Sequence, residues 1–111
     1  MKKNLPLSAG YILKNEFMIP LGITGYKLSQ EIDVAQITIS QIINNKRKIT
    51  PDVAIRLSKY FCNSAEFWLN LQDIYDLRIA LKEKKEIYKK IKPFKYKKSI
   101  DVKKWFLRKI I

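Results

Sequence analysis

The chain has 111 residues, 47% hydrophobic content and a formal net charge of +13, which suits one small domain with its own core. No apolar run is long enough to span a membrane and no signal peptide opens the chain, so we expect a soluble, cytoplasmic protein without a membrane partner. With no histidine, one cysteine and three glycines, it lacks the usual residues of metal clusters, disulfides and phosphate loops. We therefore predict no enzyme activity, no metal site and no cofactor.

The first helix is predicted over residues 8–19. Its apolar residues lie near helical spacing, at Ile12, Leu13, Phe17 and Met18. Pro20 and Gly22 follow, and we expect these two residues to end the helix.

Residues 24–47 predict two short amphipathic helices that meet at a sharp corner. Leu28 and Ile32 are four residues apart, and Ile39 and Ile42 are three apart, so both pairs can face one core. Asp33 stands at the corner, where a left-handed residue is needed. This arrangement is typical of a helix-turn-helix, whose second helix enters the DNA major groove. The alternative is a pair of core helices that bind no nucleic acid.

The outward face of the second helix favours DNA binding. It carries side chains that both donate and accept hydrogen bonds, namely Gln36, Thr38, Gln41 and Asn44. Three cations follow directly, at Lys46, Arg47 and Lys48. A polar face followed by cations suits base contacts and then phosphate contacts, although either feature alone is also typical of an ordinary solvated surface.

Two further helices are predicted after the basic run. Thr50 and Pro51 form an N-cap followed by an N1 proline, and Asn63 and Glu66 have capping-box spacing. Cys62, between these helices, is expected to be a buried thiol. Five helices with short connections predict an all-α domain.

The fifth helix has more apolar surface than one face needs, because Phe67 and Trp68 are adjacent and cannot point at the same core. We predict a homodimer interface on this helix. Its expected residues are Phe67, Trp68, Leu71 and Tyr75. The alternative is packing within one chain.

The C-terminal part carries most of the charge. Residues 82–111 hold thirteen Lys or Arg against three Asp or Glu, whereas residues 1–81 hold ten against seven. We expect the fifth helix to continue through Ile87 and Ile91 to Pro93, followed by an extended stretch at 94–98 and a last amphipathic helix capped by Ser99. The predicted domains are thus 1–92 and a basic extension, 93–111. The extension can dock on the domain or a partner subunit, contact DNA backbone, or bind another protein or an anionic membrane.

The strings NKRKIT and EFWLNLQDIYDLR, with LKNEFMIPLGIT before them, resemble the HigA-type antidote branch of the XRE/Cro helix-turn-helix regulators. The resemblance covers residues 8–82. It implies a five-helix lambda-repressor-like fold and an antitoxin that neutralises an mRNA-cleaving HigB/RelE-like toxin. It also implies a dimer that binds double-stranded operator DNA and represses its own operon. Toxin binding by the basic extension is disfavoured, since such a toxin is itself expected to be basic.

The same resemblance assigns base contacts to the first, second and sixth positions of the recognition helix, here Gln36, Ile37 and Gln41. Ile37 departs from the usual polar residue, so its contact would be apolar, for instance with a thymine methyl. Asn44 and Lys46 fall where the family contacts phosphates, and Asn45 replaces the usual loop glycine. Two alternatives stay open: a stand-alone XRE-family regulator without a toxin partner, and an interaction module that has lost DNA binding. The operator sequence and the toxin surface are not given by the residues.

Overall fold

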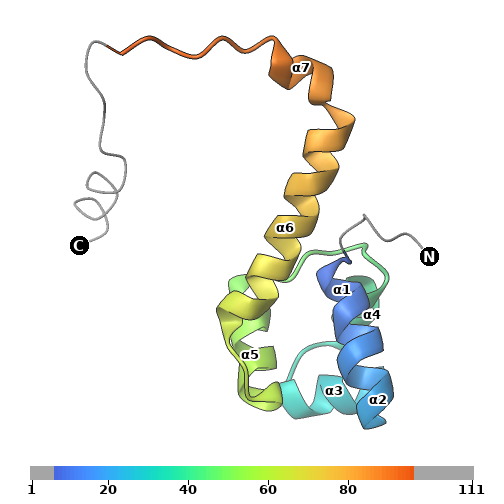
Figure 1. The fold of residues 1–111 in the computed structure, drawn as a ribbon. Coiled ribbons are helices and arrows are strands. Elements are labelled where there is room, and N and C mark those ends of the chain that lie inside the picture. Colours follow the sequence, from blue (N-terminus) through green and yellow to red (C-terminus); the bar gives the residue numbers. More distant parts are fainter. Residues whose placement is uncertain (1–6, 97–111) are drawn as a thin grey trace.

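The computed structural model describes residues 7–96, and these residues form helices and connections without a β-strand (Figure 1). One continuous rod contains α1 (Ala9–Ile12), the π-helix η1 (Leu13–Met18) and α2 (Ile19–Leu21). The remaining helices are α3 (Gly25–Ile32), α4 (Gln36–Ile43), α5 (Pro51–Phe61), α6 (Ala65–Glu83) and α7 (Lys85–Lys89). The predicted all-α fold is confirmed, with five helices in the predicted order and α7 as an addition.

The first rod ends later than predicted. Pro20 lies inside its last turn, and only Gly22 ends the helix, in a left-handed conformation with φ of 67°. Proline has no N–H and crowds the carbonyl four residues earlier, so a regular α-turn is disfavoured just before it. The chain adopts the wider π-turn of η1 there and continues through Pro20.

Among residues 7–96, side-chain caps begin four helices, α1, α3, α5 and α6, at Ser8, Thr24, Thr50 and Ser64. Thr24 Oγ1 accepts from Lys27 N at 3.0 Å. Thr50 Oγ1 accepts from Val53 N at 3.3 Å, which confirms the predicted cap at Thr50. The predicted capping box at Asn63 is wrong, because Ser64 is the N-cap of α6. Asn63 Oδ1 instead accepts a hydrogen bond from Trp68 Nε1 at 2.9 Å. That bond satisfies an indole N–H that would otherwise be buried without an acceptor.

In the described part of the chain, three non-glycine residues end helices or turns in the left-handed conformation: Asp33, Asn45 and Cys62, with φ of 57°, 59° and 59°. The predictions for Asp33 and Asn45 are confirmed. Cys62 is exposed rather than buried, because it is the C-cap of α5 and its side chain leaves the packed face there. Each such residue stores strain that glycine would not.

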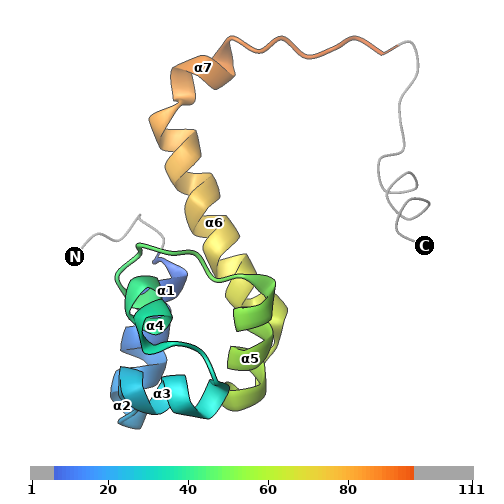
Figure 2. The same ribbon diagram turned by 180° about the vertical axis from the view of Figure 1, so that it is seen from behind.

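The core lies where α1, α3, α4, α5 and the start of α6 meet (Figure 2). Within residues 7–96, the largest side chains that are less than 2% exposed are Leu13, Leu28, Ile39, Ile42, Leu57 and Trp68. The predicted inward pairs of α3 and α4 are all among the buried residues. Trp68 stacks near Phe17 and Phe61, with ring centroids 4.9 Å and 6.1 Å away. The prediction that Trp68 forms a dimer interface is wrong, because its side chain faces the core of its own chain.

The distal half of α6 leaves the body, and α7 continues from its far end (Figure 1). Every residue from Leu81 to Tyr96 is exposed. The predicted continuous helix through Ile91 is wrong, since α6 ends at Glu83, α7 ends at Lys89, and residues 91–96 are irregular. Crowded lysines at 82, 84 and 85, with no tertiary packing to hold them, disfavour an unbroken helix. Lys97, Lys98 and the predicted helix after Ser99 lie outside the described residues. Within 7–96, no helix is apolar and long enough to cross a bilayer.

Candidate nucleic-acid interface

The corner between α3 and α4 is held by bonds at the end of α3. Ser29 is buried and its Oγ donates to Tyr26 O at 2.7 Å, so its small side chain allows the close approach of the two helices. Val34 N donates to Ser29 O at 3.1 Å as the chain turns through Asp33. These contacts fix the direction in which α4 leaves the turn.

Arg56 on α5 stabilises the corner between α3 and α4, a role that the sequence did not predict. Its Nη1 donates to the carbonyls of Ile32 and Asp33, both at 3.0 Å, while its Nε pairs with Asp52 at 3.1 Å. The guanidinium thus satisfies the carbonyl end of α3, where a cation is favourable. The spacing of four residues predicts the ion pair between Asp52 and Arg56. It does not indicate that Arg56 also contacts Ile32, which lies 24 residues earlier in the chain.

The predicted reading face lies on the surface of α4. Gln36 is exposed and Ile37 is 62% exposed, while Thr38 and Gln41 are half-buried. Ala35 gives α4 no side-chain cap, so the first N–H groups of α4 have no side-chain acceptor from that residue. Such N–H groups at a helix start attract anions.

The loop after α4 brings the predicted phosphate-binding residues together. Asn44 Nδ2 donates to Ser40 O at 2.9 Å, and Arg47 Nε donates to Gln41 Oε1 at 2.8 Å. Lys46 is exposed. Lys48 points to α6, where its Nζ lies 2.5 Å from Asp76 Oδ2. The structure therefore places the four predicted phosphate-binding residues in one loop, but the ammonium of Lys48 lies beside the carboxylate of Asp76.

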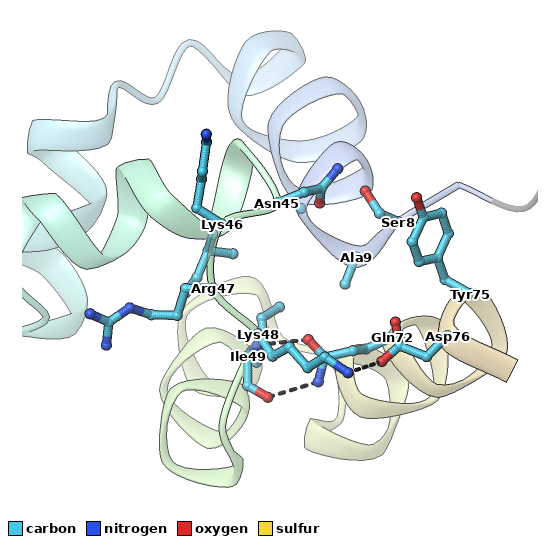
Figure 3. A pocket seen from close by; sticks show the side chains of 12 residues that line it. Ser8, Ala9, Asn45, Lys46, Arg47, Lys48, Ile49, Gln72, Tyr75 and Asp76 are labelled. Carbon is cyan, nitrogen blue, oxygen red and sulfur yellow. Dashed lines mark hydrogen bonds and ion pairs between the residues drawn. The ribbon is translucent and has the colours of Figure 1, made fainter. Parts of the chain in front are cut away.

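A cavity of about 220 Å³ lies between the start of α1, this loop and α6 (Figure 3). Gln72 spans its floor: Oε1 accepts from Ile49 N at 2.7 Å and Nε2 donates to Ile49 O at 3.0 Å. Gly10 provides the close approach of α1 to α4, since a Cβ there would lie 2.1 Å from Ile42 O. The sequence predicts neither the contact of Gln72 with Ile49 nor that of Gly10 with Ile42, because these partners lie 23 and 32 residues apart.

Residues 15–64 match the helix-turn-helix family HTH_3. The chain is 40% identical over 91 residues to antitoxin HigA-1 of Vibrio cholerae, covering 82% of this chain and 86% of the relative. The chain belongs to the HigA family. The predicted membership in the HigA-type branch of the XRE helix-turn-helix proteins is thereby confirmed.

Two other known proteins are similar to this chain. One is virulence-associated protein I of Dichelobacter nodosus, 37% identical over 87 residues, covering 78% of this chain and 81% of the relative. The other is a solved structure of Pseudomonas aeruginosa antitoxin HigA with the higBA promoter. That structure is 37% identical with a TM-score of 0.75, and the match covers 99% of it but 81% of this chain. Nearly one fifth of this chain thus has no counterpart in that HigA structure.

Proposed function

We propose that this chain is the antitoxin of a type II toxin-antitoxin module, binding operator DNA to repress its own operon and neutralising a HigB/RelE-like mRNA-cleaving toxin. The observation that carries the proposal is the exposed polar face of α4 in a helix-turn-helix shared with an antitoxin solved on promoter DNA. Such a protein acts by binding, without catalysis, and works in the cytoplasm where its operator and its toxin's mRNA targets are found.

In this proposal α4 reads the major groove. Gln36 and Gln41 can each form a bidentate pair with an adenine, and Thr38 can hydrogen-bond to either kind of base edge. Ile37, which is 62% exposed, offers an apolar contact to a thymine methyl.

The phosphate contacts belong to the loop after α4. Asn44, Lys46 and Arg47 lie on its exposed surface, with Lys48 beside them. These contacts position the protein on the duplex and give salt-dependent affinity without sequence preference. Arg47 also orients the carboxamide of Gln41, so one side chain links phosphate binding to base reading.

We propose that the homodimer forms through an apolar stripe on α6, defined as Phe67, Leu71, Ile74, Leu77 and Leu81. Four of its side chains are strongly exposed in the single chain: Phe67 by 37%, Ile74 by 50%, Leu77 by 60% and Leu81 by 53%. Their spacing of three and four residues aligns them on one side of the helix. Tyr75 lies toward the cavity instead, at the edge of the stripe. A two-fold dimer would present two α4 helices to two half-sites.

The decisive experiment co-expresses the tagged chain with the product of the reading frame beside its gene. We expect a stable complex, growth arrest by the neighbouring product alone, and relief of arrest by this chain. A Gln41→Ala variant should still relieve arrest but lose operator preference, which separates the two activities. Operator binding without a partner or toxicity would instead make the chain a stand-alone regulator, and loss of both would refute the proposal.

A further inference from the structure

The loop after α4 is held to α6 by side chains on two successive turns of that helix. Gln72 makes two hydrogen bonds to the backbone of Ile49, which is 3% exposed and anchored in the core. Asp76, one turn later, binds Lys48, the residue before Ile49 (Figure 3). The position of the Lys48 backbone is therefore fixed within reach of Asp76 before any ligand arrives.

Lys48 differs from the two cations beside it. Among residues 7–96, Lys46 and Arg47 form no ion pair, whereas the Lys48 ammonium contacts a carboxylate at 2.5 Å. The Lys48 side chain is 71% exposed and that of Asp76 is 38% exposed. An ion pair this exposed is weak, so a phosphate of bound DNA can compete for the same ammonium.

We propose that Asp76 is an internal competitor for DNA phosphate, which holds Lys48 on α6 and limits the affinity of the loop for DNA. The inference rests on the proposed operator binding, and in it the Lys48–Asp76 ion pair sets the affinity for DNA. Lys46 and Arg47 are free of ion pairs within residues 7–96 and can bind phosphates directly. Lys48 can bind a phosphate only when its ion pair with Asp76 breaks.

The test compares Asp76→Asn with Asp73→Asn, a matched control. Asp73 is an exposed carboxylate on the same helix that forms no ion pair within residues 7–96, so its loss removes the same charge without freeing a cation. Binding is measured on the duplex upstream of the gene and on a scrambled duplex of equal length, in about 0.15 M salt to screen distant charges. We expect Asp76→Asn to bind both duplexes about two- to fivefold more tightly, the range of an exposed pair, and Asp73→Asn to bind as wild type does.

A double-mutant cycle with Lys48→Ala identifies the pair as the cause. Asp76→Asn should have no effect in the Lys48→Ala background, and with Lys48 present it should steepen the salt dependence by about one counterion. Equal effects of the two aspartate variants, persistence of the effect without Lys48, or weaker binding by Asp76→Asn would overturn the inference. Failure of the wild-type chain to bind either duplex would overturn operator binding itself, which is a distinguishable result. Unchanged thermal unfolding of the Asp76→Asn variant shows that the comparison is made between folded proteins.

Discussion

Replacing Gly10 by alanine tests whether the first helix sets the position of the recognition helix. A Cβ at residue 10 would lie 2.1 Å from the carbonyl oxygen of Ile42, and 3.0 Å from Asn45 Oδ1. Ordinary contact begins at 3.4 Å, so α1 and the end of α4 must move apart by about 1.3 Å. The closest atom belongs to the backbone and cannot be relieved by a side-chain rotation.

The expected cost follows from two opposing terms. Overpacking of this kind costs about 1–3 kcal/mol and sometimes more, whereas alanine gains up to about 1 kcal/mol over glycine in a helix. Because the clash involves two backbones, we expect a net loss of about 2 kcal/mol in the free energy of unfolding. For a domain of this size that loss lowers the melting temperature by roughly 10 °C. DNA binding should weaken as well, since the displaced element is α4.

Unfolding by urea and by heat, monitored by circular dichroism, measures this loss in the free energy of unfolding. The Gly25→Ala variant is the matched control. A Cβ at Gly25 would meet nothing nearer than Ile39 Cγ2 at 4.0 Å, so that variant should unfold within about 0.5 kcal/mol of wild type. If Gly10→Ala were as stable as Gly25→Ala, the close approach would not be a constraint and the reasoning would be refuted.

Four other substitutions have predicted effects. Gln41→Ala should relax base preference by about 1–3 kcal/mol, whereas Lys46→Ala should weaken binding to all sequences and flatten the salt slope by about 0.9; identical behaviour of the two on every duplex would contradict their assigned roles. Cys62→Gly should raise unfolding stability by about 1 kcal/mol, because it relieves the left-handed strain at φ of 59°; a lower urea midpoint would contradict this. Leu77→Glu should leave the chain folded but monomeric by light scattering, since this side chain is 60% exposed; a persistent dimer would place the interface elsewhere.

Local sequence signals were sufficient to predict the order of the helices from α1 to α6 and the inward faces of α3 and α4. Periodic apolar residues such as Leu28 and Ile39 determine which side of a short helix faces the core, and caps such as Thr50 determine where it starts, because both effects act within one or two turns. The exposed cations after α4 and the left-handed turn at Asp33 are equally local. The strings that resemble HigA added the family, which the relatives confirm.

Only the tertiary structure decided what happens between segments far apart in the chain. Trp68 and Phe67 are indistinguishable as adjacent aromatic residues, yet α1 and α5 pack on one side of α6, burying Trp68 and leaving Phe67 37% exposed. The contacts of Asp76 with Lys48 and of Gly10 with Ile42 join residues 28 and 32 positions apart. Helix periodicity relates residues within a few turns, whereas these contacts depend on the angles at which whole helices meet, and packing of the complete core sets those angles.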